Sequence, residues 1–89
     1  MSEEEPSRDW ATTAEVAKGA GVKAHSTVFL WVKRGVLPEP TIIERGRLGR
    51  TARWPLDAPA QAAWVRKMTT LGYTWEEIAR KLKAGEFKP

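Results

Sequence analysis

Glycine and proline interrupt this chain so often that only short helices and strands fit between them. Gly35 is followed closely by Pro38 and Pro40, and Gly72 and Gly85 break the second half of the chain. Glycine adopts the left-handed turn that ends many helices, while proline lacks the amide proton that a helix interior donates. An 89-residue chain cut in this way has room for one small domain of several short elements, and not for two domains.

Two capping boxes mark the starts of predicted helices. Thr12 precedes Glu15 by three residues, and Thr74 precedes Glu77 by three. In this pattern the threonine hydroxyl accepts a hydrogen bond from the glutamate amide, and the glutamate carboxylate accepts one from the threonine amide. Asp57 is a further candidate N-cap, with a proline in the turn that follows. We therefore predict a short helix after Thr12 that Gly19 and Gly21 end, and further helices over about 25–34, 57–71 and 75–84.

Tryptophan and aliphatic residues at helical spacing predict the core. The sequence holds five tryptophans, and 42% of its residues are hydrophobic, which favours a folded domain over a disordered chain. Trp31, Trp54 and Trp64 fall on the apolar sides of their elements, and packing explains them better than stacking on unpaired bases. Phe29 borders the apolar stripe of its helix, and we expect it in the core. Leu30 fits the core, contact with thymine methyl groups, or contact with another protein.

Residues 41–54 have the pattern of a two-stranded β-hairpin. A β-branched segment is followed by a turn that contains two glycines, and the chain then returns toward Trp54. An isolated hairpin is marginal in water, so it must pack on the helices, and Trp54 is the natural anchor. The sequence therefore predicts a mainly α fold with about four helices and a small hairpin.

Four arginines fall within nine positions of this hairpin, from Arg45 to Arg53. The planar fork of arginine suits bidentate contact with phosphates, and we favour this interpretation over a merely solubilising tip. Arg45 and Arg47 share one face if strand geometry continues through them. Arg53 either contacts phosphate or pairs with Glu44 across the strands.

Positive charge is concentrated in the middle of the chain. The net charge is +4, made of −4 in residues 1–15, +6 in residues 16–55 and +2 in residues 56–89. A basic middle segment is typical of proteins that bind a polyanion, although a solvated basic surface has the same composition. Nucleic acid is therefore the first candidate partner.

Several other classes of function lack the residues that they need. The chain has no cysteine and a single histidine, His25, so it has no disulfide framework, cysteine-rich zinc site, paired-histidine metal centre or Cys/His nucleophile. We expect no enzyme activity and no cofactor. No apolar run approaches the ~18 residues of a membrane span, and the acidic start is unlike a signal peptide. We therefore expect a cytoplasmic, nucleoid-associated protein without a membrane partner.

Four short motifs follow one another in a recognisable order. They are TAEVAK at 13–18 with Gly21-Val22, TVFLWVKRGVLP at 27–38, the pair Arg53-Trp54, and LGYTWEEI at 71–78. In this order the chain resembles MerR-type regulators and excisionase-like proteins over about residues 12–83. The resemblance implies a winged helix-turn-helix fold whose second helix enters the major groove of double-stranded DNA while the hairpin contacts the backbone. It also implies transcription regulation, or an accessory role in organising DNA.

The chain also departs from the family pattern. The arginine and tyrosine that family members place on DNA are replaced by Phe29 and Leu30, and the long dimerisation helix is missing. We expect a flexible acidic tail at 1–9, a DNA-binding domain at 10–84, a short tail at 85–89, and no small-molecule effector domain. Because one small domain covers little DNA, we expect self-association on DNA or a protein partner.

The candidate DNA contacts come from three segments. Lys33 is the best placed for a base edge or a phosphate, whereas His25 is either a contact or an exposed turn histidine. A protein-interaction module that inhibits a regulator is the alternative function, because Phe29 and Leu30 stand where DNA contacts are expected. The full candidate set is Thr13, Lys18, Lys23, His25, Ser26, Leu30, Lys33, Arg34, Arg45, Arg47, Arg50 and Arg53.

Overall fold

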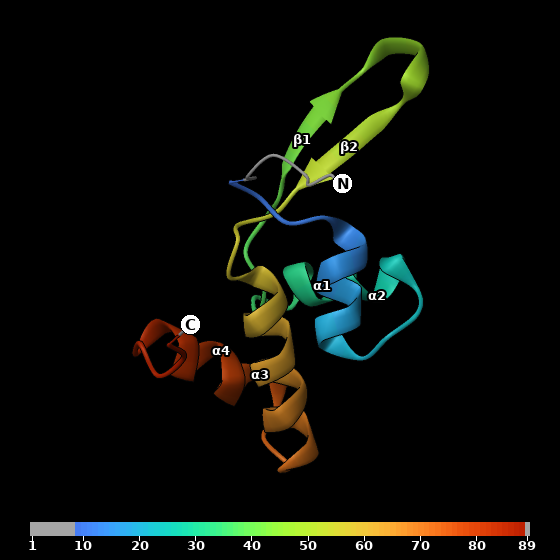
Figure 1. Cartoon of the computed structure of the whole chain (residues 1–89). Helices are drawn as coiled ribbons and strands as arrows, with labels where there is room; N and C mark the ends of the chain where they lie inside the picture. Colours follow the sequence, from blue (N-terminus) through green and yellow to red (C-terminus); the bar gives the residue numbers. More distant parts are fainter. Residues whose placement is uncertain (1–8, 89) are drawn as a thin grey trace, which may run out of the picture.

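The computed structural model describes residues 9–88, so the predicted tail at 1–9 lies almost wholly outside the described residues. The described chain forms four α-helices and one antiparallel hairpin. Figure 1 shows the helices gathered into one body from which the hairpin projects. The elements are α1 (Thr13–Ala20), α2 (His25–Lys33), β1 (Thr41–Glu44), a 3₁₀ turn (Gly46–Leu48), β2 (Arg50–Arg53), α3 (Ala58–Thr70) and α4 (Trp75–Lys83).

Both predicted capping boxes are confirmed. The Thr12 amide donates to Glu15 at 2.8 Å, and the Glu15 amide donates to the Thr12 hydroxyl at 3.1 Å. Thr74 and Glu77 repeat the same two distances at the start of α4. The hydrogen bond from the Thr74 amide lowers the pKa of the Glu77 carboxyl. Asp57 occupies the N-cap position of α3, but its side chain makes no capping hydrogen bond, so the prediction was correct in place and wrong in mechanism.

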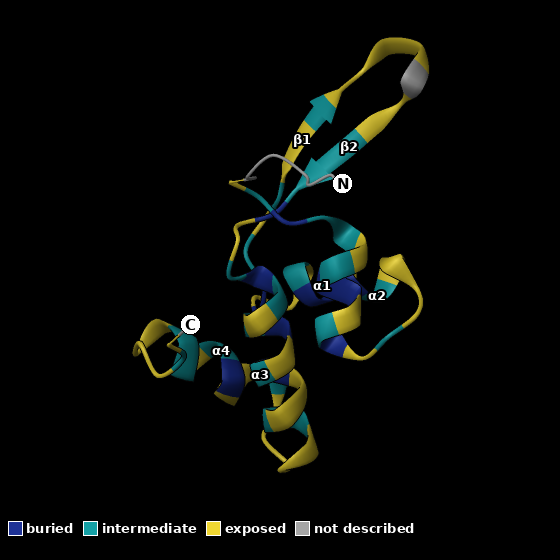
Figure 2. Cartoon of the chain, in the orientation of Figure 1, coloured by how far each residue is buried: buried dark blue, intermediate teal, exposed yellow. Residues whose placement is uncertain are grey.

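The core lies where α1, α2 and α3 meet. Val16 of α1, Val28 of α2 and Val65 of α3 are fully buried. In Figure 2 the buried residues gather in this part of the helical body, whereas most of the hairpin is exposed or half-buried. Helix α4 joins the core through buried Ile78, and its Trp75 ring packs 5.6 Å from the Trp31 ring.

Gly19 does not end α1, which corrects the sequence prediction. It lies inside the helix, where α1 passes so close to α3 that a Cβ at this position would stand 2.2 Å from the Pro59 carbonyl oxygen. The helix ends at Ala20, and its C-cap is Gly21, whose φ of 75° is the left-handed conformation that glycine favours. Gly19 therefore permits a close crossing of α1 and α3 and does not stop the helix early.

The hairpin is attached to the helical body at its base. Residues pair in register from Thr41 with Arg53 to Glu44 with Arg50. Beyond β2, Trp54 pairs with Ala11 through two backbone hydrogen bonds of 2.8 and 2.9 Å. The Trp54 side chain is 1% exposed, and its Nε1 donates to the Thr13 hydroxyl at 2.9 Å. Trp54 is thus the anchor that the sequence predicts.

The end of the described chain folds back onto the helices. The Phe87 ring lies 5.8 Å from the Trp64 ring of α3. Lys81 of α4 donates to the Glu86 carboxylate at 3.2 Å and lies 4.5 Å from the centre of the Tyr73 ring. The hydrogen bond to Glu86 raises the pKa of Lys81. Lys81 is therefore half-buried and paired with Glu86.

Between residues 9 and 88, no helix combines the length and the apolar content needed to cross a bilayer.

Candidate nucleic-acid interface

Two arginines at the hairpin tip are freely exposed. Arg45 and Arg47 are exposed and have no ionic partner within the described chain. The strand geometry stops at Glu44, and the 3₁₀ turn that follows is closed by a 2.7 Å hydrogen bond from the Arg45 amide to the Gly49 carbonyl. Strand geometry therefore does not continue through Arg45 and Arg47, so the condition under which they would share a strand face is not met.

Arg50, and not Arg53, pairs with Glu44. The two residues are register partners, and the Arg50 Nε lies 3.2 Å from a Glu44 carboxylate oxygen. Both side chains are more than 70% exposed, so solvent screens the pair and its contribution to stability is small. The guanidinium of Arg50 remains accessible to a phosphate, in competition with Glu44.

Arg53 belongs to the base of the hairpin, which corrects its assignment to the arginine tip. Its guanidinium lies 4.8 Å from the centre of the Trp10 ring, and its Nε is buried without a hydrogen-bond partner. A shallow pocket surrounds this contact and includes the acidic residues Asp9 and Glu39. Trp10 is the partner that sequence reasoning missed, since nothing local links residues so far apart in the chain.

Helix α2 presents one exposed stripe of mixed character. The stripe, which we call the α2 stripe, consists of His25, Ser26, Phe29, Leu30 and Lys33. Its spacing of three and four residues places these side chains on one face, opposite the buried positions of the helix. No side chain caps the amino end of α2, where the Thr27 amide donates to the Ala24 carbonyl at 3.1 Å.

Phe29 is 38% exposed and Leu30 is 44% exposed. The prediction that Phe29 lies in the core is therefore wrong. One side of its ring packs on Trp54, with 5.4 Å between ring centres, and the rest is open to solvent. Leu30 is at the surface, so it is not a core residue. Contact with thymine methyl groups and contact with another protein both fit this exposure.

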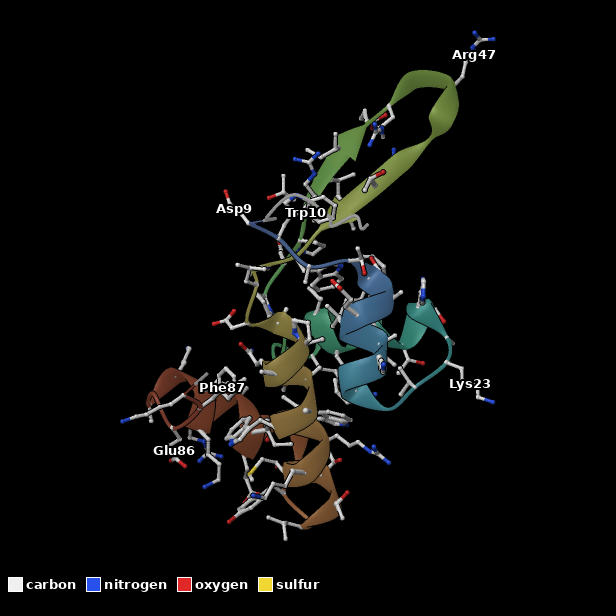
Figure 3. The ribbon with its side chains drawn as sticks, viewed as in Figure 1. Asp9, Trp10, Lys23, Arg47, Glu86 and Phe87 are labelled. Atoms are coloured by element: carbon white, nitrogen blue, oxygen red, sulfur yellow. The ribbon has the colours of Figure 1, made fainter. Side chains whose placement is uncertain are left out.

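The Phe29 contact brings the hairpin base to the α2 stripe. Because Trp54 directly follows β2, its ring against Phe29 fixes where the hairpin leaves the helical body. Figure 3 shows Arg47 at the hairpin tip and Lys23 in the loop before α2, both on the right-hand side of the view, while Glu86 and Phe87 lie on the left.

The remaining candidates differ in accessibility. Lys18, Lys23 and Lys33 are exposed, and residues 9–88 supply no ionic partner for them. Arg34 instead lies 5.0 Å from the centre of the Trp75 ring, where it links α2 to α4. The Thr13 hydroxyl already accepts the Trp54 hydrogen bond, which leaves its proton for one further acceptor. Thr13 and Arg34 are thus primarily structural.

The described residues contain no cluster of histidine, aspartate and glutamate suited to a metal ion. The chemistry of this surface is therefore that of lysine and arginine cations around an apolar pair. Comparison with protein-family models, with curated proteins and with solved structures finds no match to the chain.

Proposed function

We propose that the chain binds double-stranded DNA as a winged helix-turn-helix protein of the MerR-like or excisionase-like kind. In this proposal α1 and α2 form the helix-turn-helix, α2 enters the major groove, and the hairpin is the wing that contacts the neighbouring backbone. The protein acts as a transcription regulator or as an accessory factor that organises DNA at the nucleoid.

The contact between Phe29 and Trp54 carries the proposal. It joins the middle of the α2 stripe to the base of a hairpin whose tip holds Arg45 and Arg47. A helix in a major groove has phosphates on both sides, and a basic ribbon that starts beside the helix reaches the next stretch of backbone. The exposed cations and the wing therefore suit one duplex bound across both elements.

Salt dependence is the first test. Each phosphate neutralised by lysine or arginine contributes about −0.9 to the slope of log affinity against log salt concentration. Five or six contacts from the exposed cations predict a slope of roughly −5. A mobility-shift series on duplex DNA measures this slope, and absence of binding at low salt would contradict the proposal.

A charge-matched pair of double variants separates the wing from net charge. Arg45→Ala with Arg47→Ala removes two exposed tip cations, and we expect weaker binding to every sequence with a slope shallower by about 2. The control, Lys67→Ala with Lys83→Ala, removes the same charge from exposed positions on α3 and α4. Equal effects of the two pairs would show that the wing has no special role.

The small size of the domain favours cooperation. A single DNA-binding module buries about 600–1,000 Å² of protein surface, less than tight and specific complexes bury. We propose that copies associate on repeated DNA sites or that a protein partner adds contacts. Sedimentation with and without duplex DNA distinguishes assembly from independent binding.

A protein-interaction module is the second candidate function. The exposure of Phe29 and Leu30 favours it, because apolar side chains at the surface are typical of protein interfaces. In this case the apolar pair and the basic wing bind an acidic protein, such as a regulator that the chain inhibits. Recovery of one defined protein partner, with no binding to duplex DNA at low salt, is the result that this alternative predicts.

A further inference from the structure

We infer that Leu30, supported by Phe29, reads thymine methyl groups on the major-groove edge of the duplex. The inference rests on the proposed function and specifies what α2 recognises. Three features of the α2 stripe carry it: the order of its charges, the side chains that it lacks, and the way in which Phe29 is held.

Lysines flank the apolar pair of the α2 stripe. Lys23 lies in the loop before α2, and Lys33 is the last residue of the helix. The major groove is wide enough to admit an α-helix, with phosphates on its two rims and base edges in its centre. An apolar pair between two lysines therefore suits base edges that lie between phosphates.

Most of the stripe lacks the side chains that read bases by paired hydrogen bonds. The sequence of α2, HSTVFLWVK, has no arginine, asparagine, glutamine or acidic residue. Of the residues that make bidentate contacts to bases, only Lys33 is present, at the carboxyl end of the helix, whereas the C5 methyl of thymine is the apolar feature of the groove. Leu30 and Phe29 occupy the centre of the stripe, so methyl contact is the readout that this part of α2 is equipped to make.

Phe29 is held in place before any ligand binds. Its ring packs on Trp54, which is itself 1% exposed and hydrogen-bonded to Thr13. Leu30, at 44% exposure, is the next residue of the same helix. Two apolar side chains between cations form a patch that is small for a protein partner, because a stable protein interface buries ~800 Å² on each side. The geometry thus favours a duplex as the occupant.

Replacement of thymine by uracil tests the inference directly, because it removes the C5 methyl and leaves base pairing intact. Duplexes are first selected from a random pool with the wild-type chain. Each thymine of the tightest duplex is then changed singly to uracil, and affinities are measured for wild type, Leu30→Ala and Leu30→Met. The control is Leu71→Ala, which removes another exposed leucine, 62% exposed, at the turn between α3 and α4.

We expect one or two positions at which uracil weakens wild-type binding about fourfold, the ratio that corresponds to ~0.8 kcal/mol for one buried methyl. At those positions Leu30→Ala should bind thymine and uracil duplexes equally, while Leu30→Met and Leu71→Ala keep the wild-type preference. Thermal unfolding confirms that each variant is folded.

Three results would overturn the inference. Uracil without effect at every position would exclude methyl readout while leaving DNA binding intact. An undiminished thymine preference in Leu30→Ala would assign the readout to another residue. Equal affinity of wild type and Leu30→Ala for the thymine duplex would leave the apolar pair to a protein partner. Failure of the wild-type chain to bind any duplex would instead refute the proposed function itself.

Discussion

Gly19→Ala should destabilise the protein, although alanine is the better helix former. In an exposed helix interior this change is worth about 1 kcal/mol of stabilisation, because alanine loses less backbone entropy on folding. At Gly19 the new Cβ would stand 2.2 Å from the Pro59 carbonyl oxygen, whereas carbon and oxygen normally approach to about 3.3 Å. The obstructing atom is backbone, so α1 and α3 must separate by about 1 Å.

That separation acts on the best-packed part of the core. Val16, Ala17 and Ala20 of α1 are buried, and a gap of 0.5–1 Å forfeits about a quarter to a half of each dispersion contact. Overpacking costs about 1–3 kcal/mol in well-packed cores. If overpacking at Gly19 costs about 3 kcal/mol and the helix propensity of alanine returns about 1 kcal/mol, the net loss of stability is about 2 kcal/mol. For a domain of this size the melting temperature falls by about 10 °C.

Thermal and urea unfolding, followed by circular dichroism and tryptophan fluorescence, measure the effect. Ala14→Gly is the matched control, because Ala14 is exposed in the same helix. There we expect a loss of about 1 kcal/mol from propensity alone. Both substitutions should therefore destabilise the protein, although one replaces glycine by alanine and the other replaces alanine by glycine. A Gly19→Ala variant as stable as the wild type, or more stable, would refute the close crossing of α1 and α3.

Three further predictions concern the caps and the wing. Thr12→Ala and Thr74→Ala each remove one capping box, and urea unfolding should show a loss of about 1 kcal/mol for each. The pKa of Glu77 is lowered in the folded protein, so its stabilising contribution is complete above the unfolded value of about 4.3 and disappears as the pH falls through the folded pKa. The melting temperature of Glu77→Gln should therefore fall less steeply on acidification than that of the wild type. Glu44→Gln releases Arg50 for phosphate, and fluorescence anisotropy should show tighter duplex binding with a salt slope steeper by about 0.9.

Features of the fold that depend on local chemistry could be predicted from the sequence. Each capping box, at Thr12 and at Thr74, forms its hydrogen bonds within four consecutive residues. The types of those residues therefore determine where the helix begins. The hairpin and the anchoring role of Trp54 also follow from a short segment and its one large aromatic residue. The prediction of α2 over 25–34 agrees with the observed helix to within its C-cap.

Features that depend on distant residues could not be predicted in the same way. Gly19 is an ordinary helix breaker until Pro59, forty positions later in the chain, comes against it. From the sequence, pairing of Arg53 with Glu44 is one of two alternatives, because the conformation of the turn that sets the register depends on more than local residue types. The turn over residues 45–49 places Arg50 opposite Glu44, and a shift of register moves every later side chain along the ladder. Arg53 is then free to pack on Trp10.

Phe29 shows why the candidate site resists a division into core and surface residues. Its ring is packed on Trp54 on one side and open to solvent on the other, so it belongs both to the hairpin anchor and to the α2 stripe. Replacing it would shift the wing and remove an apolar contact at once, and neither loss could then be measured separately. Leu30 has no ring to pack and is more exposed. The recognition that we propose for α2 can therefore be tested at Leu30 separately from folding, and that separation is what makes the uracil experiment decisive.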